Sequence, residues 1–290
     1  MLKTSPAQRA DGLAPLAPRF DLLLCDIWGV LHNGVSAYAA ASDALTRFRA
    51  GGGSVVLVSN APRPNAEVVR QLAALGVPPQ AYDAIVTSGD VTMDLMAERA
   101  GQSLHHIGPA RDTPMFGEGL ARVALEGADY VVCTGLLDDE TETPEDYRAA
   151  IAVMRARGLT MICANPDLVV ERGHRLIYCA GAIADAYAQA GGAVIYAGKP
   201  HAPIYHKALA VAAGLRGGAV PAERVLAVGD AIRTDVTGAS GIGIPVAFIA
   251  AGIHAAELIG ADGELADERV GEFLGSASAQ PDFVMRNLRW

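Results

Sequence analysis

Four short segments carry the side chains of this 290-residue chain whose types and spacing could do chemistry. They contain Asp26 (LLLCDIWGVLHNG), Ser59 and Asn60 (VVLVSNAPRP), Lys199 (AGKPHAPIY), and Asp230 and Asp235 (VLAVGDAIRTDVTGA). Taken singly, each segment has a purely structural explanation, because Asp beside Gly is common in turns and Ser-Asn often caps a helix. Taken together, the segments supply a carboxylate nucleophile, anion ligands, a cation and oxygen ligands for a metal ion.

The elements that must position these side chains are short apolar strands alternating with helix-period segments. Strands are expected at 22–25 and 55–58 with helices at 37–49 and 64–75, and later strands at 194–197, 225–228 and 246–249 with helices at 204–213 and 235–239. This alternation is typical of an α/β fold with a parallel sheet, here a Rossmann-like core. Open parallel sheets bind ligands at the carboxyl ends of their strands, so the four segments are expected to meet at one sheet edge.

The middle of the chain repeats the α/β pattern and predicts a second domain. Strands are expected at 130–134 and 160–164, and helices at 144–157 and 182–190. We therefore predict a discontinuous core domain of residues 1–87 and 193–290, with an inserted α/β cap domain at 88–192.

Composition excludes several classes of function. The net charge is −9 and no run of Lys and Arg occurs, so neither a nucleic-acid nor an anionic-membrane footprint is present. The start of the chain has no apolar region typical of a secretory signal, and the apolar stretch 242–253 is too short to span a bilayer. A cytoplasmic protein is expected. The composition leaves the oligomeric state open, and a homo-oligomer is compatible with it.

The motifs GKPHAPIY and VGDAIRTDVTGA, with the terminal segment PDFVMRNL, resemble those of the haloacid dehalogenase superfamily. The resemblance is to its class IIA branch, whose cap is inserted between the second and third motifs. It extends from about Phe20 to the end of the chain. It implies a hydrolase, in most members a phosphatase, acting on a small phosphorylated metabolite such as a sugar or nucleotide phosphate.

The resemblance also implies a nucleophile and a metal site. Asp26 would attack phosphorus and form an aspartyl-phosphate that water then hydrolyses. Mg²⁺ would be held by Asp26, Asp230 and the backbone carbonyl of Trp28, with Asp235 supporting the site, because Mg²⁺ prefers oxygen ligands.

The remaining residues of the motifs would bind the phosphoryl group. Ser59 would hold one of its oxygens, helped by backbone amides around Trp28, Gly29 and Asn60. Lys199 would neutralise the charge shared between Asp26 and the phosphoryl group. In the cap, Asn165 and Asp167 of the ANPD segment would contact the rest of the substrate, although Asn-Pro-Asp is also strongly turn-forming.

One position departs from the family pattern. Its phosphatases have a second Asp two residues after the nucleophile, as the general acid and base, and here that residue is Trp28. An indole N–H cannot replace a carboxyl group in this role, which typically contributes about 10²- to 10⁴-fold in rate.

Three explanations of Trp28 remain open: a substrate with a good leaving group, another acid from the cap or from His32 or His201, or a site that binds phosphate without turnover. The alternative function is therefore a catalytically weak or silent binding protein for phosphorylated ligands. Carbon–halogen hydrolysis is a third class, and the retention of Lys199 and Asp230 argues against it.

Overall fold

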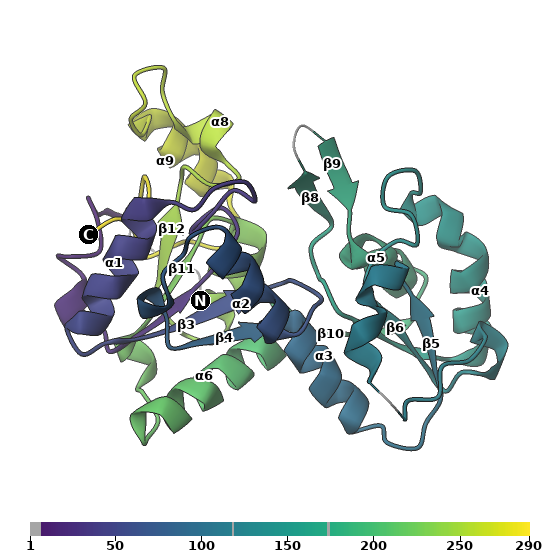
Figure 1. Ribbon diagram of the computed structural model, residues 1–290. Coiled ribbons are helices and arrows are strands. Elements are labelled where there is room, and N and C mark those ends of the chain that lie inside the picture. The colour runs from purple at the N-terminus through teal and green to yellow at the C-terminus, as the bar shows by residue number, and fades with distance from the viewer. Residues whose placement is uncertain (1–6, 118, 173–174) are drawn as a thin grey trace. The chain divides into compact units, whose positions relative to one another are not determined.

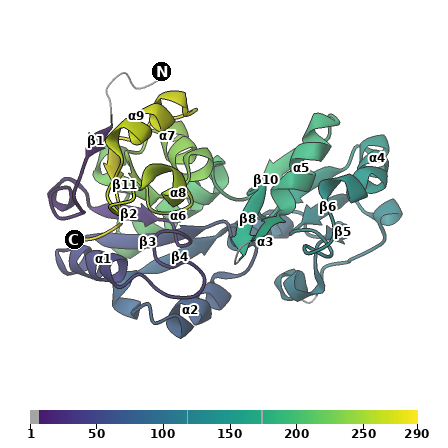
Figure 2. The same ribbon diagram turned by 90° about the horizontal axis from the view of Figure 1, so that it is seen from above.

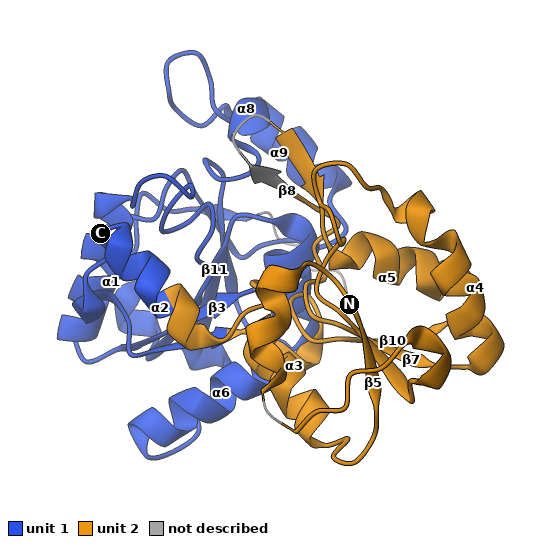
Figure 3. Ribbon diagram, turned by 45° about the vertical axis from the view of Figure 1, so that its right-hand side comes forward, with its two compact units in different colours: residues 1–59, 69–86, 205–290 blue, residues 60–68, 87–204 orange. Residues whose placement is uncertain are grey.

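The computed structural model describes residues 7–117, 119–172 and 175–290 (Figure 1). The chain divides into two compact units (Figure 3). Unit 1 comprises residues 1–59, 69–86 and 205–290, and unit 2 comprises residues 60–68 and 87–204.

Unit 1 is built on a seven-stranded sheet. Its order is β1 (Gln8–Arg9), β13 (Phe283–Met285), β12 (Val246–Ile249), β11 (Val225–Gly229), β2 (Leu22–Cys25), β3 (Ser54–Ser59) and β4 (Ala84–Thr87). The central pairs β11–β2 and β2–β3 are parallel, with Cys25 opposite Val228 on one side and Leu57 on the other. The carboxyl ends of these three strands therefore lie level at one edge of the sheet.

Strands β2 and β11 are apolar throughout, as expected for a sheet with helices on both faces. All four residues of β2 and all five of β11 are buried. The helices are α1 (Ala39–Ala50), α2 (Asn65–Ala74), α6 (Ala202–Arg216), α7 (Thr237–Gly241), α8 (Ala255–Leu258) and α9 (Asp267–Ser276), with a π-helical turn, η7 (Ile232–Val236), before α7. Figure 2 shows α1 and α2 on one side of this sheet and α7 and α9 on the other.

Unit 2 has a four-stranded parallel sheet of its own. Its order is β10 (Ala193–Tyr196), β7 (Thr160–Cys163), β6 (Tyr130–Cys133) and β5 (Leu104–Ile107). The other elements are the antiparallel hairpin of β8 (Val169–Arg172) and β9 (Arg175–Tyr178), and helices α3 (Ser88–Ala97), α4 (Arg148–Arg157) and α5 (Ala180–Gln189). Alternate residues of β6 pack into two separate cores, with Val131 and Cys133 in one and Tyr130 and Val132 in the other. Both faces of the sheet are therefore covered.

The strand expected at 194–197 differs from its prediction. It was expected to return to the sheet that contains Asp26, but β10 pairs with β7 in the sheet of unit 2. The physical reason is that a short apolar run encodes a strand without encoding its partner. Here Val194 and Tyr196 pack on the core beside α5, and this tertiary contact selects the partner. In the described part of the chain, no helix combines the length and apolar character needed to cross a bilayer.

Candidate active site

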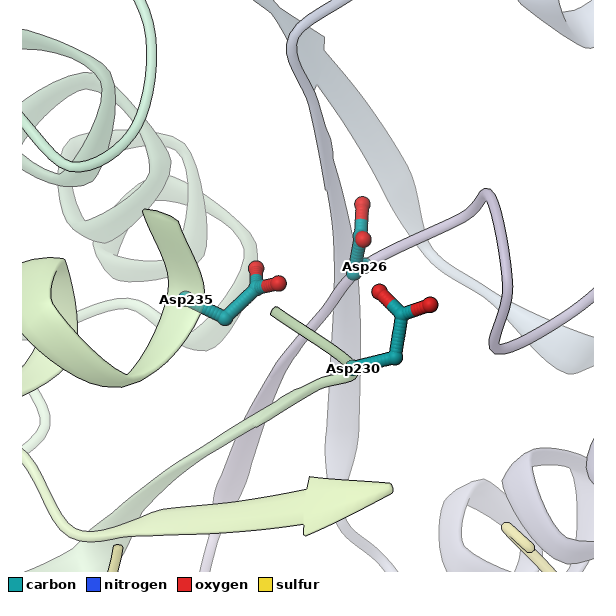
Figure 4. Close-up of side chains that lie close together, drawn as sticks. All are labelled: Asp26, Asp230 and Asp235. Carbon is teal, nitrogen blue, oxygen red and sulfur yellow. The ribbon is translucent and has the colours of Figure 1, made fainter. Parts of the chain in front are cut away.

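Three carboxylates of unit 1 converge at the carboxyl edge of its sheet. Asp26 follows β2, Asp230 follows β11, and Asp235 lies in η7. One oxygen from each lies within 4.8 Å of the others, and Figure 4 shows Asp235 reaching from its helical segment toward the other two. The structure brings together these three residues, which the sequence predicted to meet at one sheet edge, and their roles stay a prediction.

Asp26 is held by the strands beside it. Its N–H donates to the carbonyl of Val228 at 2.8 Å, which continues the β2–β11 ladder by one residue. Its Oδ1 accepts the N–H of Ile27 at 2.7 Å. Asp26 is partly exposed, whereas Asp230 and Asp235 are buried. The partly exposed carboxylate is the one of the three that a substrate in solution reaches most readily.

Asp230 is clamped between two glycines. A Cβ atom at position 29 would lie 1.9 Å from its Oδ2, and one at position 252 would lie 2.1 Å from the same oxygen. That oxygen also accepts the N–H of Ile253 at 2.7 Å. The backbone therefore approaches this carboxylate from two sides, and only glycine permits that approach.

Asp235 is oriented in the same way by its own segment. Its Oδ2 accepts the N–H of Ala231 at 3.2 Å, and its own N–H donates to the carbonyl of Ala231 at 3.0 Å. A Cβ at Gly229 would lie 2.1 Å from its Cγ. The π-helical turn thus aims Asp235 back toward the end of β11.

The charges at this edge favour a cation. Three carboxylates so close together repel one another, and burial of two of them raises the cost of that repulsion. Their field reaches Tyr38, whose hydroxyl pKa is raised by burial and by the charge of Asp230. A divalent cation with oxygen ligands is the group that this arrangement accommodates.

Trp28 lies in the loop that follows Asp26, and its indole is fixed by packing. The ring meets that of His32 edge to face at 5.2 Å, and a Cβ at Gly34 would lie 2.3 Å from the indole. The Nδ1 atom of His32 accepts the N–H of Gly34 at 2.9 Å, and burial lowers the pKa of this imidazole. The sequence predicted that the N–H of Gly29 would donate to a phosphate. In the structure this N–H donates to the carbonyl of His32 at 2.8 Å and so stabilises the loop.

The other predicted residues are divided between the two units. Ser59 ends β3, beside β2, and so lies on the strand that neighbours Asp26. Asn60, Asn165, Asp167 and Lys199 belong to unit 2, as does His201, whose ring stacks on that of Tyr196 at 4.3 Å.

Within unit 2, the side chain of Asn60 joins two of these residues. Its Oδ1 accepts the backbone N–H of Lys199 at 2.7 Å, while its Nδ2 donates to the carbonyl of Lys199 and to Oδ1 of Asp167, both at 3.0 Å. A Cβ at Gly198 would lie 2.4 Å from Oδ1 of Asn60. The side-chain amide is therefore engaged with the protein, and it positions the Lys199 backbone.

Unit 2 also contains a cavity of about 330 Å³. Asn165 contributes to its wall, together with Arg63, Arg111 and the buried Asp112. Burial raises the pKa of Asp112, although a hydrogen bond from Thr134 and the two guanidinium groups oppose the shift. The wall combines these polar groups with apolar side chains such as Leu136 and Ile177, and the size of the cavity suits part of a small metabolite.

Sequence reasoning did not identify Gly229, Gly252 or Tyr38 as parts of the site. Gly252 matters only because the distant Asp230 folds against it, so no local pattern distinguishes it from a turn glycine. Gly229 contacts Asp235 of its own segment, VLAVGDAIRTDVTGA, in which the sequence pointed only to the two carboxylates. The raised pKa of Tyr38 is likewise a property of the fold, since it depends on burial and on the charge of Asp230.

Comparisons with known proteins agree with this geometry. A family model described as haloacid dehalogenase-like hydrolase matches residues 23–118, and a second, described as HAD-hydrolase-like, matches residues 196–290. No curated protein matches the chain.

Solved structures resemble the chain over nearly its whole length. A hydrolase of the haloacid dehalogenase-like family from Brucella suis 1330 is 46% identical, with a TM-score of 0.82 over 96% of this chain and 99% of that one. A 4-nitrophenylphosphatase from Thermotoga maritima is 27% identical, with a TM-score of 0.70 over 94% and 96%. A possible sugar phosphatase from Cytophaga hutchinsonii is 18% identical, with a TM-score of 0.77 over 97% and 98%, and this likeness concerns the fold alone.

Proposed function

Because the chain belongs to the haloacid dehalogenase-like hydrolase family, we propose that it is a Mg²⁺-dependent phosphatase acting on a small phosphorylated metabolite. The observation that carries this proposal is the convergence of Asp26, Asp230 and Asp235 at the end of the central strands. The likeness to a 4-nitrophenylphosphatase supports the reaction type. The substrates to screen are small phosphorylated metabolites, including the sugar and nucleotide phosphates that the resemblance implies.

The donor set fits Mg²⁺. This ion binds oxygens at about 2.1 Å, so two ligands on opposite sides of it lie about 4.2 Å apart. The three carboxylates present oxygens within 4.8 Å of one another, close to that spacing. Asp26, Asp230 and the carbonyl of Trp28 would hold the ion, with Asp235 supporting it. When bound, Mg²⁺ would neutralise charge on the transferring phosphoryl group.

In the first half of the reaction, Oδ2 of Asp26 attacks phosphorus while Oδ1 keeps its bond from Ile27. The P–O bond of the substrate breaks, and the leaving oxygen takes the electron pair. The product is an aspartyl-phosphate. In the second half, water attacks phosphorus and passes a proton to the surrounding solvent, the P–Oδ bond breaks, and inorganic phosphate leaves with the carboxylate of Asp26 restored.

Several residues would stabilise the transferred group. The Ser59 hydroxyl and the backbone N–H groups of Trp28 and Asn60 would donate to its oxygens. Lys199 would supply a positive charge near Asp26. The side chain of Asn60 holds the backbone of Lys199 by two hydrogen bonds. Asn60 directly follows Ser59 in the chain, so the residue that positions Lys199 is covalently joined to the residue that would bind the phosphoryl group.

The cavity of unit 2 is a candidate site for a polar portion of the substrate other than the group that carries the phosphate. Asn165 lines it, and Asp167 follows two residues later with one carboxylate oxygen accepting from Asn60. With arginine, carboxylate and amide groups in its wall, the cavity suits a polar group.

The test is release of inorganic phosphate from a broad panel of phosphorylated metabolites. Purified protein is expected to release phosphate from at least one compound with Mg²⁺ present and to lose this activity with a chelator. D26N is expected to abolish turnover while leaving the fold intact. A panel without turnover at any Mg²⁺ concentration would contradict the proposal.

Trp28 favours a second candidate, a binding protein for phosphorylated ligands that is catalytically weak or silent. An indole occupies the position where a general acid would be needed for a poor leaving group. This candidate predicts that a phosphorylated metabolite raises the melting temperature with Mg²⁺ present and is recovered unchanged after long incubation.

A further inference from the structure

We propose that the natural substrate carries its phosphate on an oxygen attached to an aromatic ring, so that the protein is an aryl phosphatase. This inference rests on the proposed phosphatase function and deepens it by naming the leaving group. Two features of unit 1 carry it: the absence of an acid from the loop after Asp26, and an apolar rim, by which we mean the exposed side chains of Trp28, Val35 and Ile253 on segments that follow or contact the carboxylates.

The first feature is the composition and packing of the loop from Ile27 to Tyr38. This segment contains no Asp, Glu, Lys, Arg or Cys, and its titratable side chains are His32 and Tyr38. His32 is only 2% exposed, with the indole of Trp28 against its ring and Nδ1 already accepting from Gly34. A phenol is too weak an acid to suit general-acid catalysis near neutral pH, and burial and the charge of Asp230 raise the pKa of Tyr38 further.

The chemistry of the leaving oxygen follows from this composition. An alkoxide is about as basic as hydroxide, because alcohols and water are both far weaker acids than phenols, so it needs a proton as the P–O bond breaks. A phenoxide, whose conjugate acid has a pKa of about 10, departs with the electron pair more readily. The loop therefore suits an aryloxide leaving group, which takes its proton from water after it has left.

The second feature is the character of the rim. Trp28 is 45% exposed, Val35 is 84% exposed and Ile253 is 54% exposed. Two of them lie on backbone next to the carboxylates, since Ile253 donates its N–H to Asp230 and Trp28 follows Asp26 by two residues. Val35 follows Gly34, whose added Cβ would meet the indole. Large exposed apolar side chains on the segments that carry a polar site favour an apolar ligand group.

The rim also argues for a ring rather than a sugar. A hydroxylated group loses its bonds to water when it is covered, and the side chains of Trp28, Val35 and Ile253 offer it only one donor, the indole N–H. An aromatic ring needs no such compensation and stacks on an exposed indole face. The indole is held in place by His32 and Gly34, so the platform is already ordered before a ligand binds.

The test is the dependence of kcat/KM on leaving-group pKa, measured with Mg²⁺ for ring-substituted phenyl phosphates and for simple alkyl phosphates. In the wild type, kcat/KM is expected to fall at least about 100-fold from the most acidic phenol to the least, and further for alkyl phosphates. W28D restores a carboxyl group at this position, and its kcat/KM is expected to depend only weakly on the pKa of the leaving group. Equal activity of the wild type on alkyl and aryl phosphates would overturn the inference.

A second measurement separates the ring from the leaving-group effect. W28L is expected to raise KM for phenyl phosphates about tenfold, whereas W28F, which keeps an aromatic face, changes it less. Acetyl phosphate, which has an acidic leaving group and no ring, is expected to be a poorer substrate than a nitrophenyl phosphate. Faster turnover of acetyl phosphate would overturn the aromatic part of the inference.

The two proposals fail in distinguishable ways. If no phosphate ester is hydrolysed and D26N behaves like the wild type, the phosphatase function itself is wrong. If D26N abolishes turnover but alkyl phosphates are preferred, the phosphatase function holds and the aryl leaving group is wrong. Because the indole packs on Gly34 and His32, circular dichroism is used to check that W28F and W28D remain folded.

Discussion

The backbone of Gly29 lies directly against the carboxylate of Asp230, so closely that a Cβ at position 29 would sit 1.9 Å from Oδ2. Gly29 belongs to the loop after β2, while Asp230 follows β11. The contact therefore couples the loop that carries Trp28 to the second carboxylate of the acidic cluster. Any residue larger than glycine must displace one of these two groups.

The first prediction is that G29A damages the site more than the fold. With a φ of +78° and the predicted overlap, alanine must push Asp230 out of place, and a displacement of about 1 Å is expected to lower kcat/KM by about 100-fold. The matched control is G52A, since Gly52 has a φ of +93° with no atom within 4 Å of the added Cβ. G52A is expected to cost about 1 kcal/mol of stability and to keep its activity. Similar kcat/KM values for both variants would show that the close contact between Gly29 and Asp230 does not matter for activity.

The second prediction concerns the phosphorylated intermediate. Without an acid or base at Trp28, water attacks the aspartyl-phosphate slowly, while a nitrophenolate leaves in the first step without help. Nitrophenyl phosphate is therefore expected to give a rapid burst of about one nitrophenol per chain, followed by slow turnover. Stopped-flow absorbance measures the burst. W28D should speed the second step and reduce the burst, and linear product formation in the wild type would contradict the expected order of rates.

The third prediction tests Asn60 as a positioning residue. N60A removes the acceptor of the buried Lys199 N–H, which is expected to cost about 1–3 kcal/mol of stability. If the Lys199 ammonium then shifts, kcat falls by about 100-fold with a smaller change in KM. D167N is the matched control, because its side-chain oxygen still accepts from Nδ2 of Asn60. It is expected to retain most of the activity, and an equal loss in both variants would point to Asp167 instead.

The sequence predicted the acidic cluster because its positions are encoded locally. Each of Asp26 and Asp230 directly follows a short apolar strand, and parallel neighbours bring such positions to the same edge. Asp235 lies five residues after Asp230, within reach of the same edge. Strand and turn signals of this kind need no knowledge of distant segments.

The features that the sequence did not predict depend on tertiary contacts. The close approach of Gly252 to Asp230 joins segments that follow different strands, and nothing in the neighbours of Gly252 indicates it. The partner of β10 was wrongly assigned for the same reason, since its apolar run matches either sheet and packing beside α5 selects β7. The engagement of the Asn60 side chain with Lys199, 139 residues away, is likewise a property of the fold.

The fourth prediction is that Asp235 supports metal binding without taking part in the chemistry. D235N keeps an oxygen that can accept from Ala231 but removes one negative charge from the cluster. The Mg²⁺ concentration for half-maximal activity is expected to rise about 10- to 100-fold, with kcat at saturating Mg²⁺ close to that of the wild type. Titration of activity with Mg²⁺ measures both values. A large fall in kcat at saturating Mg²⁺ would assign Asp235 a direct role.

The last prediction concerns His106 in unit 2, whose pKa is lowered from 6.5 to about 4, mainly by burial and further by the charges of Arg122 and His105. The ring lies 4.6 Å from that of Phe116, and Nε2 forms a 2.9 Å hydrogen bond with the hydroxyl of Thr134. Between pH 6.5 and 4, the unfolded chain binds a proton at this position and the folded chain does not. Stability is therefore expected to fall as the pH drops through this window, by up to about 3 kcal/mol, and to level off for this residue below pH 4.

H106Q can keep a hydrogen bond to Thr134 but does not titrate, so its stability should depend less on pH across the window. Hydrogen exchange of the β5 and β6 amides, measured between pH 7 and 4 and corrected for intrinsic rates, reports this difference locally, and an unchanged pH dependence in H106Q would assign the acid sensitivity to other groups.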